Sequence, residues 1–201
     1  MPATFLASDH HFGHEKSCTV FKRADGSPLR PFSCAEEMDE ELVKRHNERV
    51  RPKDKCYFLG DVAIARKSLK ILERLNGDKV LIRGNHDIFK LEDYTKYFRD
   101  VRGYHVMNGM IFSHVPVHPE SLGRFGVNVH GHLHYQRVKK VKGFDPDTGE
   151  FIYSDEIDPR YHCVCVEQTD YTPITIEEIK KRVLDEGGVV GFRNGNGPVV
   201  D

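Results

Sequence analysis

The chain has 201 residues, of which 38% are hydrophobic, so it can build one sizeable domain with its own core. Its formal net charge of -1 excludes binding of nucleic acid through bulk positive charge, although a local basic patch remains allowed. No positive segment precedes an apolar stretch at the N-terminus, and no run of about 18 apolar residues occurs. We therefore expect a cytoplasmic protein without a membrane span.

Three short apolar runs in the first half of the chain end abruptly in polar residues, which is typical of buried strands that lead into functional loops. They are residues 4–7, 56–59 and 79–82. Two helices are predicted between them. Ser33 and Glu36 form a capping box ahead of the first, and residues 68–75 form the second, which Asn76-Gly77 ends. This alternation predicts an α/β layer with parallel strand pairing.

The second half has a different pattern. Asn108-Gly109 separates two β-rich runs at 104–107 and 110–113, the strongest short hairpin signal. Further strands are predicted at 126–129 and 161–167, the latter with Cys163 and Cys165 on one face. We expect mostly antiparallel pairing here.

A final helix is predicted from the capping box of Thr175 and Glu178 to about Glu186. Residues 1–186 are therefore expected to form a single domain, and the glycine-rich residues 187–201 a mobile tail. The five cysteines show neither a disulfide framework nor a paired C-x-x-C zinc spacing, so we expect reduced thiols.

Ionisable side chains gather where the predicted strands end. Asp9 and His11 are two positions apart, so both project from one face if the strand geometry persists, and they can share a cation. Loops at the carboxyl ends of parallel strands converge on one crevice, where ligands distant in sequence can meet. The other clusters are Gly60-Asp61, Gly84-Asn85-His86-Asp87, Ser113-His114 and Gly131-His132-Leu133-His134.

In this order, the five clusters resemble the signature of calcineurin-like metallophosphoesterases, with Asp9-x-His11 first and Gly131-His132-x-His134 last. The segments SDHHFGH, RPF, HNERV, YFLGDVA and NVHGHLH are most similar to the small bacterial and phage members of that family. The resemblance implies an αββα sandwich in which two mixed β-sheets lie between helices, with two divalent metal ions at the sheet ends.

The resemblance also implies a role for each residue. Asp9, His11 and His134 would hold the first metal ion. Asn85, His114 and His132 would hold the second, and Asp61 would bridge both. His86 would contact the phosphate and act as general acid, with Asp87 orienting its ring. A hydroxide bridging the metal ions would be the nucleophile.

The charges of this ligand set favour an anionic substrate. Two divalent ions bring four positive charges, the two carboxylates of Asp9 and Asp61 remove two, and the neutral ligands remove none. The all-nitrogen-and-oxygen donor set suits manganese, iron, zinc, nickel or magnesium, and the resemblance favours Mn²⁺.

Several other polar residues are left with two interpretations. His14 either lines the substrate side or caps the following turn, while Arg30 and Arg83 either contact phosphate or are paired structurally. The basic segment 136–143 either guides a nucleic acid or forms a solvated hairpin arm. We expect His10 and His130 to face away from the metal ions. We expect ordinary surface or core roles for the four histidines that join no cluster: His46, His105, His118 and His162.

The sequence therefore predicts a dinuclear metal-dependent phosphoesterase acting on a small phosphate ester or a nucleotide, most simply a phosphodiesterase. The same site also suits a phosphomonoesterase or a nuclease. A third alternative is a metal-binding interaction scaffold without catalytic activity, because a fold can persist after its chemistry is lost.

Overall fold

The first β-sheet positions three of the five polar clusters. In the computed structural model, which describes residues 2–191, this sheet has five strands in the order β11-β1-β2-β3-β4. β1, β2 and β3 pair in parallel, as predicted, while β4 adds a further parallel strand next to β3, and β11 is antiparallel to β1. The strands are β1 (Thr4–Ala7), β2 (Lys55–Phe58), β3 (Asp78–Ile82), β4 (Asp100–Arg102) and β11 (Ile174–Thr175).

The second sheet has four strands in the order β10-β7-β6-β5. They are β5 (His105–Met107), β6 (Met110–Ser113), β7 (Val127–His130) and β10 (Tyr161–Cys163). β5 and β6 form the antiparallel hairpin predicted from Asn108-Gly109, whose φ angles of 53° and 72° suit a type I′ turn. The expectation of mostly antiparallel pairing in this half of the chain holds for β5-β6 and for the later pair of strands at 139–145 and 150–157, but fails for β6-β7 and β7-β10, which are parallel. Long connections return the chain to the same end of this sheet each time, which parallel strands require.

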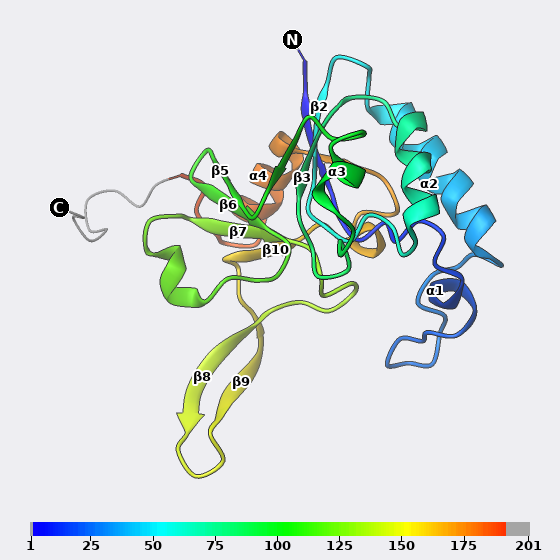
Figure 1. Ribbon diagram of the computed structural model, residues 1–201. Helices are drawn as coiled ribbons and strands as arrows, with labels where there is room; N and C mark the ends of the chain where they lie inside the picture. The colour runs from blue at the N-terminus through cyan, green and yellow to red at the C-terminus, as the bar shows by residue number, and fades with distance from the viewer. Residues whose placement is uncertain (1, 192–201) are drawn as a thin grey trace.

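A two-stranded hairpin arm, β8 (Lys139–Asp145) with β9 (Glu150–Ile157), extends from the two sheets (Figure 1). It contains most of the basic segment 136–143. Lys139 Nζ lies 3.4 Å from Asp155 Oδ1, and Lys140 Nζ lies 2.7 Å from Glu156 Oε2. Acidic side chains of β9 thus balance part of this basic charge.

The helices confirm the sequence patterns in part. They are α1 (Glu15–Thr19), α2 (Ala35–Arg49), α3 (Leu91–Tyr94) and α4 (Ile176–Asp185), with 3₁₀ segments η1 (Arg66–Arg74), η2 (Pro119–Gly123) and η3 (Val166–Gln168). The capping box of Thr175 and Glu178 is present at α4. At α2 the Ser33 hydroxyl donates to Glu37 rather than pairing with Glu36, and Cys34 is the N-cap.

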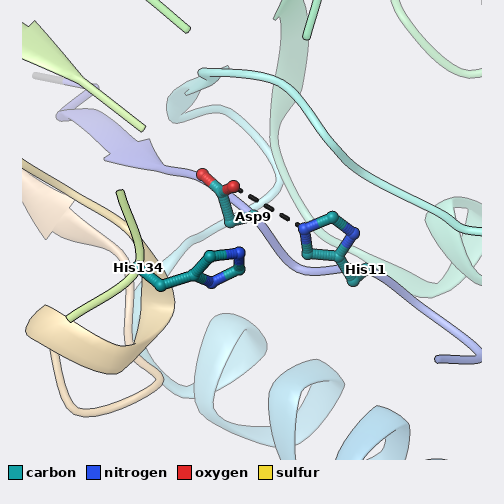
Figure 2. Close-up of side chains that lie close together, drawn as sticks. All are labelled: Asp9, His11 and His134. Atoms are coloured by element: carbon teal, nitrogen blue, oxygen red, sulfur yellow. Dashed lines mark ion pairs between the residues drawn. The ribbon is translucent and has the colours of Figure 1, made fainter. Parts of the chain in front are cut away.

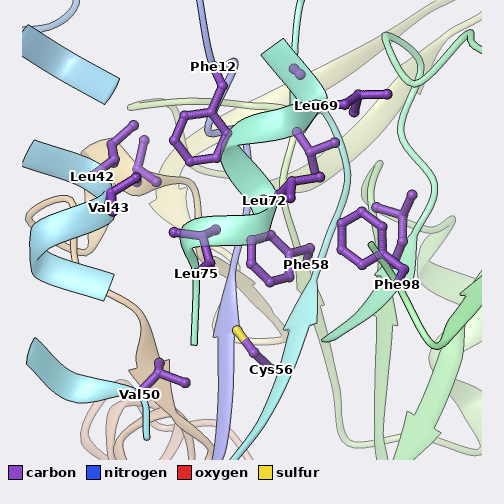
Figure 3. Close-up of a cluster of buried hydrophobic side chains, with 14 of the residues drawn as sticks. Phe12, Leu42, Val43, Val50, Cys56, Phe58, Leu69, Leu72, Leu75 and Phe98 are labelled. Atoms are coloured by element: carbon purple, nitrogen blue, oxygen red, sulfur yellow. The ribbon is translucent and has the colours of Figure 1, made fainter. Parts of the chain in front are cut away.

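The predicted helix 68–75 winds as the 3₁₀ segment η1. A 3₁₀ helix has three residues per turn, so the spacing of Leu69, Leu72 and Leu75 places all three leucines on one face. These side chains are 1%, 0% and 3% exposed and pack in the hydrophobic cluster of Figure 3.

Both faces of the first sheet are buried, and alternating side chains of each strand enter two different clusters. On β1, Phe5 packs with the residues of α2 and η1 on the helix-covered face, while Leu6 packs with the second sheet. Phe58 and Tyr57 of β2 divide in the same way. The predicted α/β class, with mixed sheets flanked by helices, is confirmed, and the four-layer αββα order stays a prediction.

The start of the glycine-rich segment contacts the domain. Gly188 N donates to Val183 O at 2.8 Å, and Val190 packs against the cluster between the sheets. Residues 192–201 of the predicted tail lie outside the described residues. Within residues 2–191, no helix combines the length and the hydropathy needed to cross a membrane.

His46 of α2 gives the fold an acid-sensitive position in its core. Its ring is 1% exposed, stacks on Phe58 and lies 2.9 Å from Asn76 O through Nε2. Burial lowers its pKa from 6.5 to about 4. Because the folded-state pKa is lower than the unfolded one, its contribution to stability is complete above about pH 6.5 and is lost as the pH falls toward 4.

We therefore expect His46→Gln to reduce the loss of stability between pH 7 and pH 4 by about 3 kcal/mol. Urea unfolding at the two pH values measures this difference, and a uniform cost of the substitution cancels from it. The control is His118→Gln, which makes the same substitution at an exposed histidine outside the core. An unchanged dependence in His46→Gln would contradict the assignment.

Candidate metal centre

The five polar clusters lie where strands end and belong to loops of both sheets. Asp9 follows β1, Asp61 follows β2 and Asn85 follows β3, while His114 follows β6 and His132 follows β7. Backbone hydrogen bonds join these loops: Asp9 N donates to Gly60 O, and Gly131 N donates to His114 O. The polar clusters of both sheets therefore meet, because ligand atoms of Asp9 and Asp61 from the first sheet lie within 4.8 Å of a ligand atom of His114 from the second.

Asp9, His11 and His134 form the first group (Figure 2). One ligand atom from each lies within 4.8 Å of the others, and Asp9 Oδ1 lies 3.6 Å from His11 Nε2. Figure 2 shows the His134 ring approaching this pair from a separate loop. The structure therefore brings together the three residues assigned by resemblance to the first metal ion.

The second group centres on Asp61 and His114, whose ligand atoms lie within 4.8 Å of one another and of Asp9. Asp61 Oδ2 lies 3.6 Å from His11 Nε2 and 3.5 Å from His114 Nε2, which places this carboxylate between the two groups. Asn85 Oδ1 lies 2.8 Å from His114 Nε2 and 3.0 Å from His132 Nδ1. The seven predicted ligands therefore form one connected cluster.

The donors in this cluster fit divalent cations. All are nitrogen or oxygen, and Asp9, His11, Asp61 and His114 are no more than 6% exposed. Asp9 Oδ1 is buried without a hydrogen-bond partner among residues 2–191. Leaving a buried carboxylate oxygen unpaired is costly, and a cation would satisfy it. These buried Asp and His groups can hold a metal ion.

Five of the seven predicted ligand positions share an unusual backbone conformation. Asp9, His11, Asp61, His132 and His134 have φ angles of 59°, 51°, 54°, 70° and 51°. A left-handed conformation costs a residue with a side chain roughly 1–2 kcal/mol. Asp9 and His11 therefore do not project by simple strand alternation, because β1 has already ended at Ala7. Strain concentrated on one group of side chains indicates a functional constraint on them.

Two glycines allow the loops to approach the carboxylates. A Cβ atom on Gly84 would lie 2.3 Å from Asp61 Oδ1, and one on Gly131 would lie 2.4 Å from Asp9 Oδ2. Any larger residue at either position would displace a predicted ligand.

Asp9 is held as a carboxylate by several contacts. Its Oδ2 accepts hydrogen bonds from Ser8 Oγ at 2.5 Å, His132 N at 2.9 Å and Cys165 Sγ at 3.1 Å. Burial acts to raise its pKa, but contact with His11 and the charge of nearby histidines bring that pKa well below its usual range. Asp9 therefore stays ionised, as a metal ligand must.

Glu167 supports the first group and was missed by sequence reasoning. Its Oε1 lies 2.9 Å from His134 Nδ1 and 2.8 Å from the guanidinium of Arg30, and the side chains of both Glu167 and Arg30 are 0% exposed. Burial acts to raise the pKa of Glu167, but Arg30 and His134 lower it. An ionised Glu167 fixes the orientation of the His134 ring through Nδ1 and leaves Nε2 to bind a metal ion.

Arg30 is paired structurally, which settles one of the open alternatives. Besides Glu167, its guanidinium donates to the backbone oxygens of Asp9 and His10.

The predicted strand 161–167 also differs from the structure, because β10 ends at Cys163. The 3₁₀ turn that follows places Glu167 beneath His134.

His86 and Asp87 lie beside the cluster in different environments. The exposed His86 ring lies 5.5 Å from the His11 ring, and His86 N donates to Asp61 Oδ1 at 2.8 Å. Asp87 is buried, and its carboxylate accepts from the backbone N–H groups of Asp61, Val62 and Gly84. In place of the ring-orienting contact implied by resemblance, the structure gives Asp87 three backbone partners. It therefore holds the Asp61 loop.

The other polar residues near the cluster make structural contacts within the protein. His14 Nδ1 accepts from Ser17 N at 3.0 Å and caps α1. Arg83 donates to the backbone oxygens of Asp87 and Phe89. His10 stacks on Phe12 in the helix-side core, and His130 Nδ1 lies 2.7 Å from Gly131 O.

Glu167→Gln is expected to lower the free energy of unfolding by about 3 kcal/mol, because it leaves the buried Arg30 charge without its carboxylate. The matched control is Glu40→Gln, which removes the exposed pair of Glu40 with Arg74 and should cost less than about 1 kcal/mol. Urea denaturation of the metal-free proteins measures both. Equal costs would show that the buried pair contributes no more than a surface one.

Comparison with known proteins finds one curated relative over nearly the full length of the chain. The uncharacterized protein MJ1445 of Methanocaldococcus jannaschii is 34% identical over 196 residues, which cover 94% of this chain and 96% of that protein. No family model matches the chain.

Two solved structures are similar. The protein of unknown function AQ665 from Aquifex aeolicus has a TM-score of 0.61 and 23% identity, covering 90% of this chain and 99% of that one, so the two share a fold. A protein characterised as a novel archaeal phosphodiesterase has a TM-score of 0.41 and 14% identity over 75% of this chain and 98% of that one, a likeness that carries no weight for fold or function. The extent and identity of the first match show that this chain belongs to the same family as the uncharacterized protein MJ1445 of Methanocaldococcus jannaschii.

Proposed function

We propose that the chain is a dinuclear metal-dependent phosphoesterase of the calcineurin-like kind, most simply a phosphodiesterase. The observation that carries this proposal is the position of Asp61, whose Oδ2 lies between His11 Nε2 and His114 Nε2 at 3.6 and 3.5 Å. A carboxylate between two groups of nitrogen and oxygen donors suits a bridge between two cations.

The seven ligands divide into two half-sites. The first half-site is Asp9, His11 and His134, the second is Asn85, His114 and His132, and Asp61 is shared. Bound there, two divalent ions would supply a water of lowered pKa as nucleophile and positive charge for the phosphoryl oxygens. With only two carboxylates in the set, the loaded site keeps a net positive charge and favours an anionic substrate. Mn²⁺ is the working choice, and iron, zinc, nickel and magnesium suit the same donors.

The chain's own residues supply positioning and a proton. His86 is exposed beside His11, and its backbone N–H is tied to Asp61 Oδ1. Its ring can therefore meet the leaving oxygen of a bound ester and protonate it as general acid. Asp87 holds the loops of Asp61 and Gly84 together, which keeps His86 in register with the bridging carboxylate.

Within this proposal a phosphodiester is the first substrate class to test. Cleavage of an alkyl phosphate ester releases a poor alkoxide leaving group, so protonation of the leaving oxygen by His86 has a large effect on the rate. The test is hydrolysis of bis(p-nitrophenyl) phosphate by chelator-treated protein as Mn²⁺ is returned. p-Nitrophenyl phosphate and single-stranded DNA serve as the monoesterase and nuclease comparisons.

Activity that returns with Mn²⁺ and is highest on the diester would support the proposal. A much higher kcat/KM on the monoester would show that the activity is that of a phosphomonoesterase and not of a phosphodiesterase. Absence of hydrolysis with Mn²⁺, Ni²⁺, Zn²⁺ and Mg²⁺, while these ions still bind, would favour the scaffold alternative.

A further inference from the structure

A hollow of about 440 Å³ opens directly beside the second half-site. Its lining includes Asn85 and His114, which are among the predicted metal ligands. The rest of the lining is mainly apolar and includes Tyr104, Ile111, Val115 and Val117. A molecule in this hollow would therefore contact apolar side chains and lie next to the predicted metal centre.

The wall is rigid. Val117 N donates to Asn128 Oδ1 at 3.0 Å, and Val117 O accepts from the Tyr161 hydroxyl at 2.8 Å. Ser113 Oγ donates to Val115 O at 2.7 Å, so the chain that leaves β6 is fixed on both sides of Val115. This side of the hollow is thus held in place by the second sheet, and binding there requires no ordering of residues 113–117.

Large apolar groups are left open to solvent on this wall. Tyr104, just before β5, is 63% exposed, and Val115, next to His114, is 48% exposed. An exposed tyrosine ring beside aliphatic side chains offers a stacking surface for a planar aromatic group. Apolar surface exposed beside a polar centre is typical of a ligand site.

The polar side chains of the hollow are engaged with the protein. Arg83 donates to the backbone oxygens of Asp87 and Phe89, and Ser113 Oγ bonds to Val115 O and accepts from Asn128 Nδ2. They are therefore poorly placed to read the hydrogen-bonding edge of a base. Arg83 still adds positive charge at the rim, which favours an anionic ligand.

We infer that this hollow binds the base of a nucleotide-type phosphodiester, with Tyr104 as the stacking residue. The inference rests on the proposed function, because it assumes that the ester phosphate lies at the adjacent metal centre. The site selects an aromatic group by its shape and accepts purines and pyrimidines alike.

The first test measures binding and does not depend on turnover. Isothermal titration of the Mn²⁺-loaded protein compares deoxythymidine 5′-monophosphate with 2-deoxyribose 5-phosphate, which lacks the base. The nucleotide should bind about 5- to 150-fold more tightly, the range expected for one stacked base. Tyr104→Ala should remove most of this difference, and Tyr104→Phe should keep it. Tyr153→Ala is the matched control, because Tyr153 is 56% exposed on the hairpin arm.

The second test compares thymidine 5′-(p-nitrophenyl) phosphate with ethyl p-nitrophenyl phosphate, two diesters with the same leaving group. Tyr104→Ala should raise KM for the thymidine ester about tenfold, leave its kcat unchanged, and leave the ethyl ester unaffected. Equal binding of the two monophosphates, or equal binding of the nucleotide by Tyr104→Ala and the unmodified protein, would overturn the inference. Base-dependent binding without hydrolysis of either diester would support the hollow as a base-binding site and would count against the proposed phosphodiesterase activity.

Discussion

Asp61→Asn is expected to lower kcat/KM on a phosphodiester by more than about 100-fold and to weaken the binding of both metal ions. Loss of a residue that merely supports a ligand costs about 10- to 100-fold, and Asp61 is assigned as a ligand of both ions. The amide keeps the size of the side chain but removes one of two carboxylate charges. Asp9 and Asp61 are both buried in one cluster, where two carboxylate charges repel each other without a metal ion. The metal-free Asp61→Asn protein should therefore be no less stable than the unmodified chain.

Metal content after dialysis and titration calorimetry with Mn²⁺ measure this effect, alongside hydrolysis of bis(p-nitrophenyl) phosphate. The control is Asp54→Asn, a buried carboxylate that accepts from Ala3 N and Arg51 N away from the cluster. It should keep two metal ions per chain. Retention of both ions by Asp61→Asn would show that Asp61 is not the bridge.

His86→Ala is expected to lower kcat by about 10²- to 10⁴-fold on a diester with an alkoxide leaving group, the range for loss of a general acid. The backbone N–H that donates to Asp61 Oδ1 persists in alanine, so metal content should stay unchanged. With p-nitrophenolate as leaving group the decrease should be much smaller, because that anion departs without a proton.

The measurement is therefore a comparison of two leaving groups: release of p-nitrophenolate from bis(p-nitrophenyl) phosphate and cleavage of a dinucleotide followed by chromatography. His118→Ala, at an exposed histidine that is not a predicted ligand, is the control. Loss of the metal ions in His86→Ala, or equal decreases for both substrates, would assign His86 a role other than proton donor.

The sequence predicts the convergence of the ligands because it depends on where strands end. Asp9, Asp61 and Asn85 each follow a short apolar run, and parallel strands bring their carboxyl ends to one edge. The same reasoning fails for the second sheet. Asn108-Gly109 fixes its own hairpin, but nothing local to 110–130 reveals that β6 and β7 pair in parallel through a long connection.

Support of the ligands is less visible in sequence. Glu167 belongs to no polar cluster, and its pattern with Cys163 and Cys165 is that of a strand until η3 redirects the side chain toward His134. Asp87 stands beside His86 in sequence, yet its carboxylate lies against three amides of two loops. Such partners are set by loop packing rather than by spacing along the chain, so only the structure reveals them.

The left-handed backbone at Asp9, His11, Asp61, His132 and His134 also bears on how such a chain can evolve. Glycine adopts this conformation without steric penalty, so a chain selected for stability alone would carry glycine at these positions. These positions carry aspartate and histidine instead, and the left-handed backbone at each of them makes folding less favourable. Under the proposed function, stability and catalysis therefore compete at each of these positions, and a relative without that function would be free to carry glycine there.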